Sequence, residues 1–289
     1  MKSSTQRWDK ALYLVPTPIG NLADMSFRAI EALKTVDIIY CEDTRITGKL
    51  CQYYDISTPL KPYHDHSDER VKRDIVQRLD RGERVALVSD AGTPMISDPG
   101  YKLVKECIQN GQKVIAIPGA NAVLPAVQMS TFPTDKFFFG GFLPSKKQER
   151  QDMIAEHLRI FENTCLVYYD SPKRLLSSLA LISDISTDVQ VSVTREISKL
   201  HEETIRGEVQ EVFDILDERD AIKGEIVLCL YRRSDDKNRL SQNQDSLVHI
   251  VQNLLKTMSV KDISQTLADV TSMSKKEIYD LALRLKNES

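Results

Sequence analysis

Short aliphatic runs and helical patterns alternate through the first 117 residues of the chain. The runs cover 12–15, 37–41, 85–88 and 114–117, and each is followed within a few residues by Pro, Gly or Asp. Between the runs, apolar residues recur at helical spacing, as at Leu103, Val104 and Cys107. This alternation of strands and helices favours a mostly parallel sheet with helices on its faces.

A second set of elements follows. Strands are predicted at 137–142, 166–169, 189–193 and 226–231, and helices around 146–160, 172–182 and 208–218. We expect a second α/β domain with more antiparallel pairing. The stretch 232–246 is polar and nearly without apolar residues, which is typical of a linker.

Three short helices are predicted beyond the linker. An apolar stripe runs from Leu247 to Leu255, Ser259 and Asp262 begin a second helix, and Ser274 with Glu277 forms a capping box for a third. The chain is therefore predicted to be an α/β protein with domains at 1–118 and 119–232 and a helix-turn-helix-like domain at 246–289.

Composition limits the classes of partner and compartment. The net charge of −3 does not suit a general polyanion binder, so any contact with RNA must use local basic patches. The 5 cysteines never come within CxxC spacing, which favours buried, reduced thiols over a disulfide or zinc framework. With no apolar run of membrane length and no secretory leader pattern, we expect a cytoplasmic protein without a membrane partner.

Four loops leave the carboxyl ends of the first-domain strands, where open parallel sheets bind their ligands. They are 16–24 (PTPIGNLAD), 41–45 (CEDTR), 89–100 (SDAGTPMISDPG) and 118–123 (PGANAV). Gly residues in them allow close backbone approach, while Asp43 and Asp90 favour a ligand with hydrogen-bond donors or positive charge. Neither GxxxxGK[ST] nor GxGxxG occurs, which argues against nucleoside triphosphates and dinucleotides.

Several longer motifs are similar to those of one family. The segments VPTPIGNLADMSFRAIEALKTVDIIYCEDTR, LVSDAGTPMISDPGYKLV, GFLPSKKQER and YYDSPKRLLSSL resemble the ribosomal RNA small subunit methyltransferase I family of the tetrapyrrole methylase superfamily, over residues 12–231. The resemblance implies a class III methyltransferase fold and S-adenosylmethionine between the two α/β domains. It also implies a homodimer that methylates the ribose 2′-oxygen of a decoding-centre cytidine in 16S rRNA, within the small ribosomal subunit.

The same resemblance implies a set of cofactor-binding residues. They are Ile19, Gly20, Asp90, Gly92, Thr93, Gly119, Asn121, Ala122 and Tyr168. The chain departs from the family at Ala120, where relatives usually have Pro, and at Asp170 and Lys173, where they have Glu and His.

Methylation of a ribose hydroxyl needs a general base, or a cation that stabilises the developing alkoxide. The candidates near strand ends are Asp43, Arg45, His64 and Asp98, with Asp43 and Arg45 preferred. An ion pair that only locks the loop is the alternative for these two. His64 and His66 lack a third ligand, so no metal site is predicted.

The compact basic groupings of the second domain are candidate contacts for RNA phosphates. They are Lys146, Lys147, Arg150, Lys173 and Arg174. Two other functions compete with RNA methylation: a methyltransferase of the same superfamily that acts on a tetrapyrrole ring, and a helix-turn-helix regulator whose α/β domains sense a ligand. The EDTR, GTPMISDPG and FLPSKK segments favour the RNA branch.

Overall fold

The computed structural model describes residues 8–64, 69–233, 248, 251–252, 254–255, 258–268 and 274–287. The chain divides into two compact units, Met1–Arg232 and Arg233–Ser289. The first unit contains two β-sheets, and the predicted boundary at 118/119 lies between the last strand of one sheet and the first strand of the other.

Along the first half of this unit the elements are β1 (Leu12–Leu14), η1 (Leu22–Asp24), α1 (Phe27–Thr35), β2 (Ile38–Cys41), α2 (Thr44–Tyr53), β3 (Leu60–Pro62), α3 (Glu69–Asp80), β4 (Val85–Val88), α4 (Tyr101–Gln109) and β5 (Val114–Ala116). The second half contains α5 (Val123–Ser130), β6 (Phe137–Phe142), α6 (Lys147–Ile160), β7 (Cys165–Asp170), α7 (Pro172–Ile185), β8 (Val189–Arg195), β9 (Glu203–Glu208), α8 (Val209–Asp217) and β10 (Ile226–Arg232).

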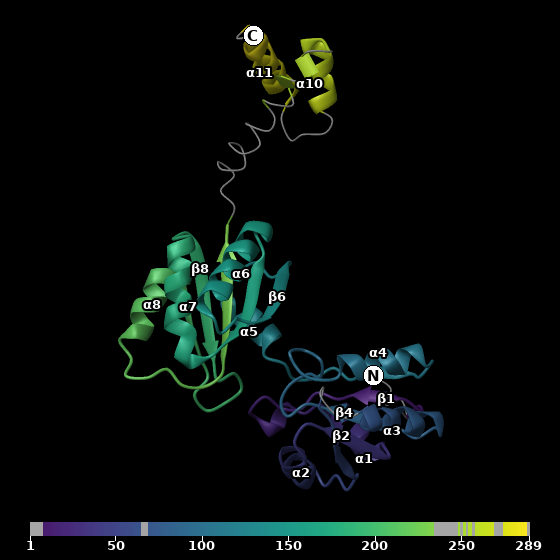
Figure 1. Cartoon of the computed structure of the whole chain (residues 1–289). Helices are drawn as coiled ribbons and strands as arrows, with labels where there is room; N and C mark the ends of the chain where they lie inside the picture. Colours follow the sequence, from purple (N-terminus) through teal and green to yellow (C-terminus); the bar gives the residue numbers. More distant parts are fainter. Residues whose placement is uncertain are drawn as a thin grey trace. The chain divides into compact units, whose positions relative to one another are not determined.

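The first sheet has the strand order β3-β2-β4-β1-β5, and every pair in it is parallel. Apolar residues of α1 and α2 pack on one face, and those of α3 and α4 pack on the other (Figure 1). Strands β2 and β4 are buried at every position, as expected for strands covered on both sides. The predicted parallel α/β sheet is confirmed.

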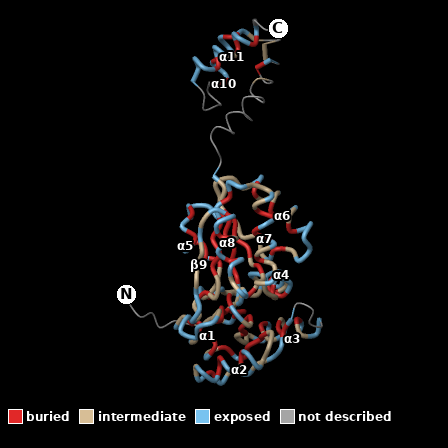
Figure 2. The backbone as a smooth tube through the Cα atoms, turned by 90° about the vertical axis from the view of Figure 1, so that its left-hand side faces the viewer, coloured by how far each residue is buried: buried red, intermediate tan, exposed pale blue. Residues whose placement is uncertain are grey.

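The second sheet has the order β6-β7-β10-β8-β9. Only the β6–β7 pair is parallel, so the predicted antiparallel character is also confirmed. Helices α6, α7 and α8 cover one face, while α5 packs on the opposite face. In Figure 2 the buried, red parts of the backbone run through these strands and the inner sides of the helices.

Strand β6 contains a β-bulge. Phe139 is opposite Val167, but Phe142 is opposite Tyr169, so three steps along β6 match two steps along β7. The extra residue falls at the two glycines between them, and Gly141 has a φ of +73° that favours glycine. Side chains alternate along a strand, so without the extra residue Phe142 and Phe139 would lie on opposite faces of the sheet. The bulge places them on the same face.

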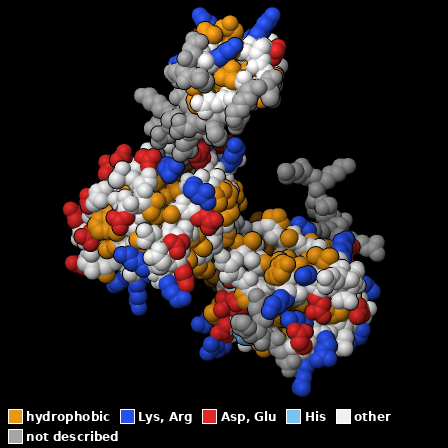
Figure 3. All heavy atoms as spheres, turned by 45° about the horizontal axis from the view of Figure 1, so that its top comes forward, with side chains coloured by type: hydrophobic (Ala, Val, Ile, Leu, Met, Phe, Trp, Pro, Cys, Tyr) orange, Lys and Arg blue, Asp and Glu red, His pale blue; other side chains and the backbone are white. Residues whose placement is uncertain are grey.

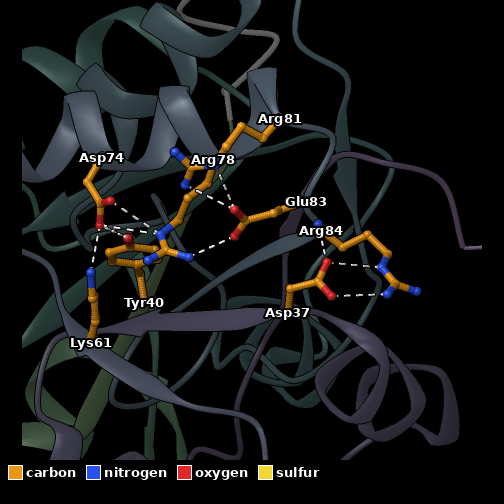
Figure 4. A network of polar contacts seen from close by, with 8 residues as sticks. All are labelled: Asp37, Tyr40, Lys61, Asp74, Arg78, Arg81, Glu83 and Arg84. Atoms are coloured by element: carbon orange, nitrogen blue, oxygen red, sulfur yellow. Dashed lines mark hydrogen bonds and ion pairs between the residues drawn. The ribbon is translucent and has the colours of Figure 1, made fainter.

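A polar network joins α3 to β2 and β3 (Figure 4). The Asp74 carboxylate accepts hydrogen bonds from the Tyr40 hydroxyl at 2.6 Å and from Lys61 Nζ at 2.8 Å. Arg78 approaches the same carboxylate at 3.3 Å and bonds Glu83 at 2.7 Å. The hydrogen bonds from Lys61 and Tyr40 lower the pKa of Asp74 to about 2. None of these residues lines the cavity described below, and we interpret the network as a structural one.

The second unit contains α10 (Val260–Ala268) and α11 (Lys275–Asn287). Ser259 Oγ accepts from the Asp262 backbone N–H, and Ser274 and Glu277 bond each other's backbone N–H groups, which confirms the two predicted helix starts. Of the predicted first helix, only 248, 251–252 and 254–255 are described, and they are helical. The predicted linker lies outside the described residues beyond 233.

All 5 cysteines are buried and unpaired, as predicted. No helix within the described ranges is both long and apolar enough to cross a membrane.

Candidate functional site

A cavity of about 400 Å³ lies in the first unit where strand-end loops of the first sheet meet the ends of strands in the second. From the first sheet it is lined by Ile19, Ala91, Gly92, Thr93, Ile96, Ser97, Asp98, Asn121 and Ala122. From the second it is lined by Phe142, Tyr169, Asp170, Ser171, Pro172, Ile197, Gly224, Glu225, Ile226 and Val227.

The loops after β1 and β4 are joined by backbone hydrogen bonds. Thr17 and Gly92 each donate an N–H to the other's carbonyl at 2.9 Å, and buried Thr17 donates its hydroxyl to the Ser89 carbonyl. Gly92 has a φ of +82°, and a Cβ there would lie 3.5 Å from Cγ2 of Ile19. Thr93 donates its hydroxyl to the Ala120 carbonyl at 2.9 Å, which ties in the loop after β5. Three predicted loops therefore form one wall.

Strand β7 contributes Tyr169 to the cavity, which differs from the prediction of Tyr168. Tyr168 has no exposed surface, and its hydroxyl lies 2.9 Å from Nδ1 of His157 in the core beneath α6. Neighbouring side chains on a strand point to opposite faces, so only one of the two tyrosines can reach the cavity. The YY pair in the sequence carries no signal for which one.

A loop between β8 and β9 closes one side of the first-sheet wall. Ser198 donates to Asp24 of η1, and Lys199 bonds both Glu196 and Glu225 at 3.0 Å. The Lys199 side chain lies so close to Gly20 that a Cβ on Gly20 would overlap it. Glycine at position 20 therefore lets its loop pack against Lys199, and Gly119 likewise packs against Pro16, where a Cβ would lie 2.8 Å from the proline Cβ; neither glycine is among the residues that line the cavity.

Among the predicted catalytic residues, Asp98 lines the cavity. Burial raises its pKa to about 6, and the neighbouring Glu42 and Asp90 add to the shift. Asp90 does not line the cavity, because its carboxylate accepts the backbone N–H of Asp43 at 3.0 Å. A partly buried carboxylate with a pKa near neutrality suits a general base.

Asp43 and Arg45 form the ion pair that was the alternative interpretation. Asp43 begins α2, accepts the Arg45 backbone N–H, and bonds the guanidinium at 2.5 Å. The hydrogen bonds from Arg45 hold the pKa of Asp43 well below its usual range, which makes it a weak proton acceptor. The Arg45 side chain is 87% exposed, and His64 is exposed outside the cavity lining.

The basic candidates of the second half divide into exposed and buried residues. Lys146, Lys147 and Lys173 are exposed. Arg150 is 3% exposed and donates to the carbonyls of Pro144 and Ser145 and to the Ser177 hydroxyl, so it holds the turn before α6 instead of facing a phosphate. On the face in Figure 3, basic and acidic side chains are interspersed.

Arg174 is partly exposed and pairs with Asp170 at 3.2 Å. The Asp170 carboxylate also accepts from the Ser171 backbone and from the Ser178 hydroxyl, both at 2.7 Å. The pair therefore fixes the turn from β7 into α7, where the cavity lining includes Asp170, Ser171 and Pro172.

The cavity combines aliphatic and aromatic walls with three acidic residues: Asp98, Asp170, which is buried against Arg174, and Glu225, which pairs with Lys199. Ligand sites of this size and mostly apolar lining are typical of small organic ligands. The Asp98 carboxylate favours a ligand that carries positive charge and disfavours phosphate. Within the part of the chain that the structure describes, no group of three His, Cys, Asp or Glu side chains could hold a metal ion.

Comparison with known proteins places this chain in a family. The family model for Tetrapyrrole (Corrin/Porphyrin) Methylases matches residues 11–212. The fold is similar to the crystal structure of cobalt precorrin-4 methyltransferase, with a TM-score of 0.55 at 16% identity over 76% of this chain and 94% of that one. The chain belongs to the tetrapyrrole methylase family.

Sequence relatives narrow the assignment. The chain is 41% identical to ribosomal RNA small subunit methyltransferase I of Bacillus subtilis, over 93% of this chain and 92% of that protein. It is 39% identical to the protein of that name from Synechocystis, over 95% of this chain and 98% of that protein. Within the tetrapyrrole methylases, the chain is a member of the ribosomal RNA small subunit methyltransferase I family.

Proposed function

We propose that this chain is an S-adenosylmethionine-dependent methyltransferase that methylates the ribose 2′-oxygen of a decoding-centre cytidine in 16S rRNA. The supporting observation is the 41% identity, over nearly the whole chain, to a relative whose name states methylation of small-subunit rRNA. The cavity supports the same activity, because it offers a ligand site and a candidate base together.

The cavity residues fit the cofactor. Ile19, Ile197 and Val227 offer apolar surface for a purine, and Gly92 lets the backbone approach it. The Asp98 carboxylate complements a ligand with an ammonium and a sulfonium group, whereas the Asp170 carboxylate is buried and already paired with Arg174. Thr93, Asn121 and Ala122 complete the proposed binding set, while Gly20, Gly119 and Asp90 shape it from outside. Bound S-adenosylmethionine supplies an electrophilic methyl group.

The chain's own contribution to the reaction is positioning and proton transfer. Asp98 accepts the proton of the ribose hydroxyl, and with a pKa of about 6 its carboxylate is mostly ionised above pH 7. Holding the hydroxyl in line with the methyl donor supplies up to about 7–11 kcal/mol of the barrier reduction. Asp43 orients Arg45, whose exposed guanidinium is placed for an RNA phosphate.

Recognition of the rRNA substrate relies on a small number of exposed basic side chains. Lys146, Lys147 and Lys173 are the proposed phosphate contacts on the second half, and the net charge of −3 favours a folded ribosomal particle over bare RNA. A homodimer and a cytoplasmic location complete the proposal, on the basis of the family resemblance.

The test is methyl transfer from labelled S-adenosylmethionine to small ribosomal subunits that lack this modification, with naked 16S rRNA in parallel and the product mapped at nucleotide resolution. One 2′-O-methylcytidine in the decoding centre is the expected product. Cofactor binding without labelling of either RNA would refute the RNA assignment and favour a small-molecule acceptor.

A further inference from the structure

Phe142 is an aromatic residue that lines the cavity and is 59% exposed. A phenylalanine ring in contact with water forgoes the free energy that burial would provide, so an exposed ring at a ligand site indicates a surface that a ligand covers. The charged and polar groups of the cavity account for a cationic cofactor, but they leave this ring unexplained.

The bulge in β6 gives Phe142 its direction. Phe139 and Phe142 are three residues apart, and regular alternation would put them on opposite faces of the sheet. Both instead contact Tyr169 edge-on, with ring centroids 5.0 and 5.1 Å away. Gly141, at φ +73°, is the glycine-dependent position that makes this possible. Bulges commonly re-aim a side chain beside an active site.

The loop that carries Asp98 lies against the bulge. A Cβ on Gly141 would lie 3.8 Å from Oγ of Ser97. Within this loop Met95 and Ser97 have φ values of +72° and +61°, unfavourable for side-chain-bearing residues, and they flank Ile96, which is 44% exposed and lines the cavity. Both walls of the cavity therefore present an exposed apolar side chain, in a cavity that Asp98 also lines.

We propose that Phe142, with Ile96, forms the platform on which the nucleobase of the methylated nucleotide stacks. This inference rests on the proposed function. A base unstacked from RNA presents a flat π-face, and aromatic side chains are the usual partners of such bases. Because Phe142 and Asp98 line the same cavity, a base stacked on Phe142 would bring its ribose toward the cavity that holds Asp98.

The experiment compares three substitutions in the full-length protein. Phe142→Leu keeps apolar bulk without a ring, Phe142→Trp keeps a ring, and Phe137→Leu is the matched control, since Phe137 is an exposed phenylalanine of the same strand outside the cavity lining. Measured quantities are kcat/KM for unmodified small subunits, the Kd for S-adenosylmethionine by calorimetry, and the thermal midpoint.

We expect Phe142→Leu to lower kcat/KM by at least about 5-fold, and by no more than the roughly 150-fold that alanine truncation of a stacking aromatic costs, with the cofactor Kd within about twofold of wild type. Phe142→Trp and Phe137→Leu should stay within about threefold. Wild-type kcat/KM for Phe142→Leu would refute stacking, and an equal loss of cofactor affinity would show that Phe142 covers the cofactor instead. A wild-type protein that binds cofactor but labels no subunit would refute the proposed function, and the stacking platform with it.

Discussion

Replacing Gly140 of β6 by alanine should destabilise the α/β half that contains the second sheet by more than the backbone conformation of Gly140 alone would cause. A Cβ at this position would lie 2.8 Å from Cδ1 of Tyr168 and nearer still to Cε1. Carbon atoms in contact prefer about 3.5–4.0 Å, so the buried ring must move by about 1 Å. Overpacking of this kind costs about 1–3 kcal/mol. Weakening of the 2.9 Å contact between the Tyr168 hydroxyl and His157 adds about 1 kcal/mol.

The expected loss is therefore about 2–4 kcal/mol, a large share of the roughly 5–15 kcal/mol that stabilises a typical protein. Gly141→Ala is the control, because its φ of +73° is strained for alanine while the nearest atom to its Cβ would be Ser97 Oγ at 3.8 Å. We expect about 1–2 kcal/mol for this control.

Urea unfolding followed by circular dichroism gives both values, provided that the slope with denaturant is unchanged. In a Tyr168→Leu background, the additional cost of Gly140→Ala should shrink, because the clashing ring is gone. The steric argument fails if Gly140→Ala costs no more than Gly141→Ala, or if the Tyr168→Leu background leaves its cost unchanged.

Three further outcomes follow from named residues. Asp98→Asn should lower kcat by about 10²–10⁴-fold, because the general base is lost. It should also raise the thermal midpoint above pH 6, because the folded-state pKa of about 6 lies above the unfolded value near 4 and ionisation of Asp98 destabilises the folded protein as the pH rises from about 4 to 6. Wild-type kcat should rise as the pH increases through 6. In the wild type, the folded-state pKa of Asp74, about 2, lies below its unfolded value near 4, so the ionised carboxylate stabilises the fold above pH 4 and this stability is lost as the pH falls from 4 to 2. Asp74→Asn should therefore reduce the pH dependence of the unfolding free energy in this range, which an acid titration of that free energy tests. Arg150→Ala should remove three hydrogen bonds and destabilise the first unit by about 2–4 kcal/mol, which scanning calorimetry would show as a lower melting temperature. Lys147→Ala should leave the melting temperature unchanged and weaken only the binding of small ribosomal subunits, measured by filter binding.

Elements with a clear periodic pattern were predictable from the sequence, and those built on tertiary contacts were not. Strand β3 is a three-residue edge strand that ends in Pro62, too short to show alternation. Helix α5 contains Pro125 and is apolar on most sides: Val123, Ala126 and Val127 pack on the second sheet, while Leu124 and Met129 are exposed. Strand β9 is the edge of the second sheet, and its mostly polar sequence shows no clear apolar alternation.

The first-sheet side of the cavity followed from the rule that ligands bind beyond the carboxyl ends of parallel strands. Asp98 was a candidate because of its place near a strand end, and the family resemblance supplied Ile19, Gly92, Thr93, Asn121 and Ala122; all of these residues line the cavity. The second-sheet side did not follow, because the choice between Tyr168 and Tyr169 depends on which face meets the cavity. Phe142 was missed because its direction depends on a bulge, and a GG pair signals a bulge only when the opposite strand is known.

Strand order also fixes when each sheet can close during synthesis. In the first sheet, β1 pairs with β4 and β5, which are synthesised later, so the sheet can be complete once residue 116 has been made. In the second, β10 pairs with both β7 and β8, so those strands keep unpaired edges until residues 226–232 arrive. Unpaired edges invite aggregation. A nascent or truncated chain ending before β10 would hold a finished first sheet beside two open strand pairs, and the cavity would lack the wall that Ile226 and Val227 provide.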